Sequence, residues 1–333
     1  MRASPLALRH LALCRRHLSR WTASRRPSYS AAASQDSVYE SPEVYDAAFG
    51  LRDFDGETQF LVDACRRHGP CPAPRTWLEL ACGPGRHTRL AAFDHGLRAV
   101  GLDVSPAMVA YAQQEAQRDC EEQELKTGSE DRVQPLFAHG DMCGAYTHAA
   151  VAASGPYDII CLLLGSLSHL THLDQAAQCF ASAKALLSAS GTFIVEMNHP
   201  RHLFDGSITQ AARRGKHDES QSWEVPGWTA HAPDGRRMDV LWGAPDDAWD
   251  AVTQTLQRTV QVHVHPGSGA AAEPATHLRC LVPSRLYTAG ELHLLASRAG
   301  LRVVATYGDL DPVGVDVEDP HAERLVAVLC HAV

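Results

Sequence analysis

The feature that most constrains this chain is the stretch of residues 76–88, which has the pattern of a buried strand, a tight glycine turn and a helix start. Its apolar run contains one acid, Glu79, and is followed by Gly83 and Gly85. A second apolar run ends in Asp103, eighteen residues after Gly85. Glycines in such a turn let the backbone approach a ligand, and an acid that ends the second strand binds ribose hydroxyls. The pattern therefore predicts a βαβ unit that holds a nucleoside.

The turn differs from a dinucleotide-binding turn. Such turns read G-x-G-x-x-G and bind a pyrophosphate at the helix N-terminus, whereas Thr88 stands at the third glycine position. The Glu79 carboxylate just before the turn would repel a pyrophosphate, but it suits a ligand with a sulfonium or an amino group. These residues resemble the first motif of the class I S-adenosylmethionine-dependent methyltransferases, with Ala81 where many members have glycine.

Further motifs follow in the order typical of that family. Ser105-Pro106 combines a favoured N-cap residue with proline at the first helical position, which indicates a helix start. Gly140-Asp141-Met142 follows an apolar run and resembles the end of the family's third strand. The resemblance covers about residues 40–333.

The resemblance implies a cofactor site at the strand ends. Asp103 would bind the two ribose hydroxyls, and Met108 would lie near the adenine. Asp141 would accept a hydrogen bond from the adenine amino group, and the residue after it would pack on the ring. An early tyrosine, Tyr45, would contact the methionine part, with Arg52 as a second candidate. The cofactor-binding residues implied in this way are Tyr45, Glu79, Ala81, Cys82, Gly83, Gly85, Asp103, Val104, Met108, Asp141, Met142 and Leu164.

The order of elements predicts an α/β fold with a Rossmann-like sheet. Short apolar runs at 157–164 and 191–197 suit the fourth and fifth buried parallel strands. The family closes its sheet with an antiparallel pair, and the runs at 302–309 and 324–330 suit that role. We expect a methyltransferase domain over residues 36–333, with these parts: N-terminal lid helices at 36–75, a cofactor-binding core at 76–199, a β insertion at 200–285, and the last helix and closing strands at 286–333.

The insertion is expected to be antiparallel and to cover the substrate side. Candidate strands are 222–225, 237–242 and 259–265, and Asp234-Gly235 is a hairpin signal. Four tryptophans would supply an apolar wall, namely Trp223, Trp228, Trp242 and Trp249. Outside the insertion, the strongly charged residues 119–134 are expected to form a surface loop.

Three residues near the expected position of the transferred methyl group are candidates for a general base. His169 follows the fourth strand, and Glu196 and His199 lie at the end of the fifth. In open α/β sheets ligands bind at the carboxyl ends of the strands. Methyl transfer from a sulfonium needs an aligned acceptor, and a base helps when the acceptor is a hydroxyl or a protonated amine. His263 and His265 share a strand face without a third ligand at suitable spacing, so no metal site is predicted.

The first 35 residues have the composition of an organelle transit peptide. They hold seven arginines, no lysine and no acid, with many serines and alanines and an interrupted apolar face. We expect targeting to the mitochondrial matrix, with cleavage between Arg26 and Ser34. A plastid is the alternative, or the cytoplasm if the segment is only a basic tail.

Charge, apolar runs and cysteine content limit the kinds of partner and of cellular compartment that the sequence predicts. Removing residues 1–35 removes seven positive charges and takes the formal charge from −9 to −16. Because affinity for nucleic acid rests on lysine and arginine, a nucleic-acid partner is not expected. No apolar run approaches the roughly 20 residues that cross a bilayer. The ten cysteines form no C-x-x-C pair, which favours a reducing compartment.

Three functions remain open from the sequence. The first is an S-adenosylmethionine-dependent methyltransferase with a small-molecule acceptor. The second is a protein methyltransferase, or a methyltransferase-like assembly factor, that acts on a basic protein. The third is a nicotinamide-dependent oxidoreductase, which Glu79 and the missing third glycine disfavour. The sequence gives no indication of the oligomeric state.

Overall fold

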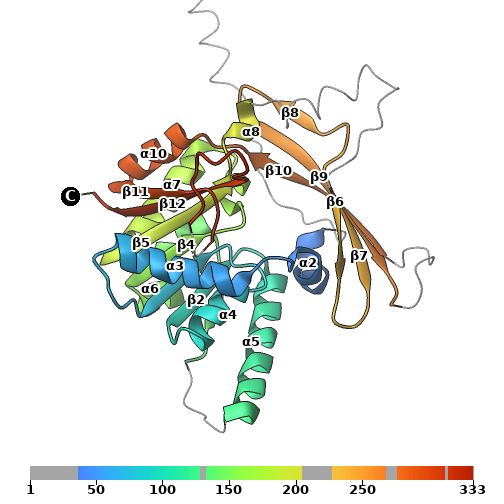
Figure 1. Cartoon of the computed structure of the whole chain (residues 1–333), viewed down its shortest axis with the longest axis horizontal. Helices are drawn as coiled ribbons and strands as arrows, with labels where there is room; N and C mark the ends of the chain where they lie inside the picture. Colours follow the sequence, from blue (N-terminus) through green and yellow to red (C-terminus); the bar gives the residue numbers. More distant parts are fainter. Residues whose placement is uncertain (1–36, 128–132, 205–226, 268–275, 312–313, 333) are drawn as a thin grey trace, which may run out of the picture. The chain divides into compact units, whose positions relative to one another are not determined.

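Two β-sheets organise the chain in the computed structural model, in which residues 37–127, 133–204, 227–267, 276–311 and 314–332 are described. The larger sheet has seven strands in the order β11-β12-β5-β4-β1-β2-β3. Figure 1 shows this sheet and the second sheet, which holds β6 to β10. The second has the order β10-β9-β7-β6, with β8 paired to β9. The expected transit peptide and the expected strand at 222–225, with Trp223, lie outside the described residues.

The larger sheet confirms the predicted Rossmann-like fold with antiparallel closing strands. Neighbouring strands from β3 to β5 pair in parallel, whereas β12 runs antiparallel to both β5 and β11. The central strands are buried along almost their whole length, because parallel sheets are covered on both faces. The strand bounds are β1 (Thr76–Leu80), β2 (Arg98–Asp103), β3 (Leu136–His139), β4 (Tyr157–Leu162), β5 (Leu187–Asn198), β11 (Leu301–Tyr307) and β12 (Arg324–His331).

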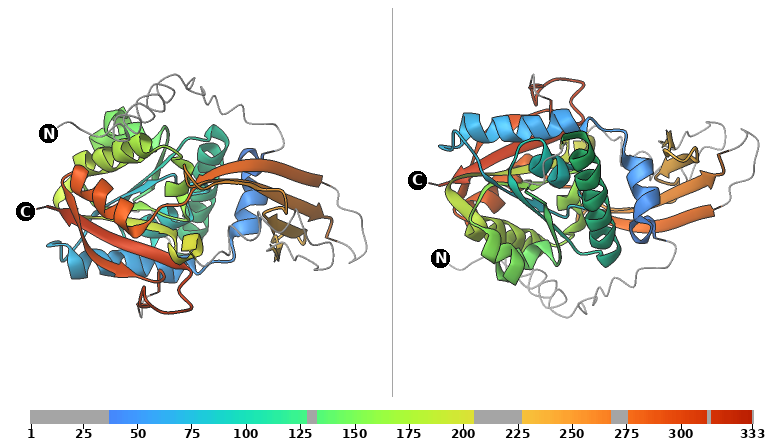
Figure 2. Two further views of the ribbon diagram at one scale, coloured as in Figure 1. Left: turned by 90° about the horizontal axis from the view of Figure 1, so that it is seen from above. Right: turned by 90° about the horizontal axis from the view of Figure 1, so that it is seen from below.

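Helices cover both faces of this sheet (Figure 2). Side chains alternate across each strand, so Leu78 and Leu80 join one buried cluster and Trp77 the other. The Leu78 face packs on α6 (Ala149–Ser154), α7 (Leu173–Leu186) and α10 (Ala289–Arg298). The opposite face packs on α3 (Phe54–His68), α4 (Arg86–Phe93) and α5 (Pro106–Thr127). A capping box between Thr288 and Glu291 begins α10.

The prediction of a surface loop at residues 119–134 is wrong for its first part, because α5 continues to Thr127. Charged and polar side chains pair along the helix, as Gln117 does with Glu121 at 2.8 Å. Cys120 is buried, and the Asp119 carboxylate pairs with Arg89 of α4. Side-chain pairs four residues apart stabilise a helix, so a charged stretch can remain helical.

The second sheet confirms the antiparallel insertion after the fifth strand. Gly235, with φ of 86°, turns the predicted hairpin between β6 and β7. No described helix is long and apolar enough to cross a membrane. The strands are β6 (Gly227–His231), β7 (Arg237–Trp242), β8 (Ala248–Asp250), β9 (Thr255–His265) and β10 (Thr276–Arg285).

The inner face of this sheet packs on the N-terminal segment, which consists of η2 (Val38–Glu40) and α2 (Pro42–Phe49). The Phe49 ring lies 5.4 Å from that of Trp228 and 5.7 Å from that of Trp242, measured between centroids. The Trp228 indole donates a hydrogen bond to the Ala48 carbonyl at 2.7 Å. These two tryptophans therefore attach the insertion to α2, which itself contacts α5 of the core.

We expect Met238→Ala to destabilise the protein, because Met238 is fully buried in the cluster between the second sheet and α2. Loss of a buried methionine side chain costs about 2–5 kcal/mol. Leu281→Ala is the control, since Leu281 lies on β10 with 59% of its surface exposed, and such changes stay within about 0.5 kcal/mol. Chemical denaturation measures both losses, and equal values would contradict this packing.

Candidate active site

Left-handed backbone shapes the turn after β1. Ala81, Gly83 and Gly85 have φ values of 56°, 51° and 72°. A Cβ on Gly85 would lie 2.7 Å from Cζ of Phe137, so this position has no room for a side chain. In front of Gly83 the nearest atom to a Cβ would be Cε1 of Tyr45, at 4.0 Å. The turn is thus packed from behind by Phe137 and faced by the Tyr45 ring.

Asp103 lies directly against this turn. Its carboxylate accepts hydrogen bonds from the Gly83 amide at 2.7 Å and the Ser105 amide at 2.8 Å. Burial raises the pKa of Asp103, although these hydrogen bonds act in the opposite direction. Cys82 is buried behind the turn and packs with α5. The structure therefore brings together Tyr45, the glycine turn and Asp103, and their role in binding the cofactor stays a prediction.

The remaining cofactor candidates lie at the ends of β2, β3 and β4. The Gly140 amide donates to the Asp103 carbonyl at 2.9 Å, which holds the ends of β2 and β3 together. Asp141 caps η3 (Met142–Thr147) by accepting from the Cys143 amide at 2.8 Å, and the Met142 side chain is partly buried. Met108 is buried, whereas Val104 is 69% exposed. Leu164 follows β4 in a left-handed conformation, with φ of 56°.

Glu79 is turned toward α4. Its carboxylate accepts from the Thr88 amide at 3.1 Å and the Thr88 hydroxyl at 2.5 Å, and it lies 3.3 Å from Nδ1 of His87. The first turn of a helix attracts a carboxylate, because its amide groups are unpaired and the helix dipole is positive there. Glu79 thereby fixes the start of the helix that follows the glycine turn.

His87 extends this contact into a buried network of charges. Its Nε2 lies 2.8 Å from Oε2 of Glu57, and Glu57 pairs with Arg52 at 2.8 Å. Burial by itself lowers the pKa of His87, but the hydrogen bonds and charges of Glu57 and Glu79 raise it to about 9. His87 therefore carries a proton at neutral pH.

The network ends at Glu196, one of the three predicted base candidates. Both guanidinium NH groups of Arg52 bind its carboxylate, at 3.0 and 3.2 Å, and Arg324 lies 3.3 Å away. The Leu164 amide donates to the same carboxylate at 2.8 Å. The oxygens of Glu196 are thus already engaged, and its geometry is that of a buried anchor for the turn after β4.

The other two base candidates lie in different surroundings. His169 of η4 (Ser166–His169) is exposed, and desolvation by the surrounding protein lowers its pKa. Its ring meets the Tyr39 ring edge-on, with centroids 5.8 Å apart. His199, in contrast, lies 2.9 Å through Nε2 from the Val317 carbonyl and accepts from the Arg201 amide through Nδ1. Among the described residues, the His169 ring therefore has fewer hydrogen-bond partners than the His199 ring. All three catalytic assignments stay predictions.

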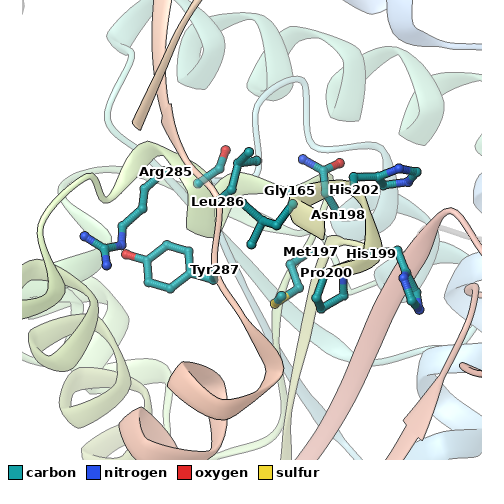
Figure 3. Close-up of a pocket in the computed structure, with 11 residues that line it drawn as sticks. Gly165, Met197, Asn198, His199, Pro200, His202, Arg285, Leu286 and Tyr287 are labelled. Carbon is teal, nitrogen blue, oxygen red and sulfur yellow. The ribbon is translucent and has the colours of Figure 1, made fainter. Parts of the chain in front are cut away.

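A crevice adjoins the ends of β4 and β5. Residues 197–200 and His202 form one side, and Arg285 and Tyr287 the other, with Gly165 between them (Figure 3). Among the described residues, no group of three or more histidine, cysteine or acidic side chains has a geometry that could hold a metal.

Sequence reasoning missed Tyr39, Glu57 and His87. The Tyr39 carbonyl accepts from the Ser105 hydroxyl at 3.3 Å, and its ring lies 5.6 Å from that of Tyr45. No spacing or motif indicated the Ser105 contact, because it joins residues 66 positions apart in the chain. The sequence did contain one signal for His87, its place directly after the glycine turn.

Comparison with known proteins agrees with this geometry. Residues 78–193 match the family model described as a methyltransferase domain. Residues 78–193 of this chain are therefore a methyltransferase domain. The chain is an S-adenosylmethionine-dependent methyltransferase, and the left-handed glycine turn with the Asp103 carboxylate against it fits that cofactor. No curated protein sequence shows significant similarity to it.

Solved structures share the fold of this methyltransferase over most of its length. One is an S-adenosylmethionine-dependent methyltransferase from Clostridium acetobutylicum, with 15% identity, coverage of 87% of this chain and 97% of that chain, and a TM-score of 0.60. DesVI from Streptomyces venezuelae has 19% identity, coverage of 87% and 98%, and a TM-score of 0.59. An amino pentose methyltransferase from Micromonospora echinaspora, with S-adenosylmethionine bound, has 16% identity, coverage of 86% and 96%, and a TM-score of 0.54.

We expect Gly85→Ala to cost the methyltransferase more stability than Gly96→Ala. Both glycines are left-handed, with φ of 72° and 65°, so both changes share a backbone strain of about 1–2 kcal/mol. Only the Gly85 change drives a Cβ against Phe137, because nothing lies within 4 Å of a Cβ at Gly96. Crowding of this kind adds about 1–3 kcal/mol. Unfolding free energies measure the difference, and a Gly96 variant that loses as much would refute the crowding argument.

Proposed function

We propose that this methyltransferase acts on a small-molecule acceptor held at the carboxyl edge of the large sheet. The observation that carries the proposal is that the N-terminal segment places aromatic side chains at this edge. The Tyr39 ring contacts both the Tyr45 ring, which faces the glycine turn, and the His169 ring after β4. A site lined by aromatic side chains suits a small acceptor better than a folded protein surface.

The second sheet supports the same proposal. It packs on α2 and, through β10, contacts η4, which carries His169. The amino pentose methyltransferase that shares the fold aligns over 86% of this chain, a span too large to be the core alone. Its named substrate class, a small hydroxylated amine, is therefore a reasonable acceptor class for this chain.

His169 has the properties of a proton acceptor for that reaction. S-adenosylmethionine supplies a methyl group on a sulfonium when it is bound. A hydroxyl or a protonated amine must lose a proton as it accepts a methyl group. Desolvation lowers the pKa of His169, so its ring is neutral at pH 7 and has a nitrogen lone pair for that proton. Tyr39 and Tyr45 exclude water and orient the acceptor. Burial raises the pKa of Tyr45 to about 12, so its phenol stays neutral at pH 7.

We expect Asp103→Asn to weaken cofactor binding about tenfold or more. It removes the charge that would bind the ribose, and it turns an NH2 donor toward the Gly83 or Ser105 amide, which now donates to the carboxylate. Calorimetric titration of wild type and variant with S-adenosylmethionine and S-adenosylhomocysteine measures the loss. Asp174→Asn is the control, since Asp174 is exposed on α7. Folded wild-type protein that binds neither compound would refute the cofactor assignment.

Assays with labelled S-adenosylmethionine distinguish the two acceptor classes. We expect transfer to members of a panel of amino sugars and other small hydroxylated amines, and a large loss of kcat in His169→Asn. A lysine-rich protein is the competing acceptor, since the chain without residues 1–35 has a formal charge of −16. Labelling of the protein but of no small amine would overturn the proposal and favour a protein acceptor.

A further inference from the structure

A continuous line of buried charged groups joins the two turns that frame the cofactor site. At one end Glu79 binds the first turn of α4, directly after the glycine turn. At the other end Glu196 binds the Leu164 amide after β4. His87, Glu57 and Arg52 connect the two carboxylates, and each step is 3.3 Å or shorter.

We propose that His87 is a positioning residue of the cofactor site, which as an imidazolium holds Glu79 and Glu57 together and so keeps the turns after β1 and β4 in place. The proposal rests on the proposed function, because it concerns the same cofactor site. His87 is 1% exposed, so it acts through Glu79 and Glu57 and does not touch the ligand.

Only the protonated ring satisfies both of its neighbours. A neutral imidazole donates from one nitrogen, whereas an imidazolium donates from both. Each nitrogen of His87 faces a carboxylate, Nε2 that of Glu57 and Nδ1 that of Glu79. Loss of the proton would therefore leave a ring lone pair against a buried carboxylate oxygen.

The charges around His87 favour the proton. Glu57 on α3 and Glu79 on β1 face the ring itself, and the Phe54 ring packs against it at 4.9 Å between centroids. Arg52 and Arg324 face Glu57 from the far side, at 2.8 and 3.7 Å. The resulting pKa of about 9 lies above the ordinary 6.5. The stability that protonated His87 contributes to the folded protein is complete below about pH 6.5 and is lost as the pH rises through about 9.

The test is the pH dependence of S-adenosylhomocysteine binding to the full chain, measured by calorimetry between pH 7 and 10. His87→Gln cannot donate to both carboxylates at once, so we expect its Kd to be about tenfold higher than that of wild type at pH 7.5. Above pH 9 the ratio of the two Kd values should fall toward one, because wild-type His87 then loses its proton. Titration of the ligand's own amino group affects both proteins equally and leaves the ratio unchanged.

Two further variants make the test specific. Glu57→Gln removes one carboxylate from the ring, so the pH at which affinity falls should move below that of wild type, which a merely structural defect would not cause. His293→Gln, on the exposed surface of α10, should behave as wild type. Circular dichroism at each pH checks folding, and Glu57→Gln carries the test if His87→Gln does not fold.

The outcomes separate the two proposals. Wild-type protein that binds S-adenosylhomocysteine, with a Kd ratio that stays constant across the pH range or near one at pH 7.5, overturns the role of His87 alone. An unchanged pH midpoint in Glu57→Gln overturns it as well. Folded wild-type protein that does not bind the compound refutes the proposed function.

Discussion

The buried ion pair between Arg52 and the carboxylates of Glu57 and Glu196 is the interaction on which the rest of the structure depends. Removing charges from water is costly, and a buried pair is tolerated only when its remaining hydrogen-bonding groups also find partners. Here one guanidinium binds both carboxylates, and His87, Arg324 and the Leu164 amide occupy their other positions. The network therefore joins the segment before α3 to the centre of the large sheet.

This network holds the two turns at the ligand-binding edge of the large sheet in a fixed conformation. The turns after β1 and β4 contain left-handed residues that are not glycine, Ala81 and Leu164. Left-handed backbone at such residues costs free energy, so surrounding contacts must hold it. Glu79 holds the helix after the first turn, and Glu196 holds the amide of the second. The strain is thus placed where ligands bind in open α/β sheets.

The second sheet depends on a different force, the burial of apolar surface. An antiparallel sheet can leave one face to solvent but must cover the other. Its covered face packs on η2 and α2, so the short N-terminal segment is shared between the insertion and the core. Because Tyr39 and Tyr45 lie on this shared segment, anchoring of the second sheet also positions the aromatic rings at the active site.

The sequence by itself determined the glycine turn, the acid that ends β2, the succession of strands along the chain and the hairpin of the insertion, because these depend on local periodicity and on residues close together in the chain. It misplaced the end of α5, where side-chain pairs and the buried Cys120 override a high density of charge. Only the tertiary structure decided the partners of Glu79, His87 and Glu196. Their contacts join residues up to 144 positions apart in the chain. In the sequence, a glutamate that serves as a base cannot be told from a glutamate that anchors a turn. The difference lies in which donors surround it, and folding alone brings those donors together.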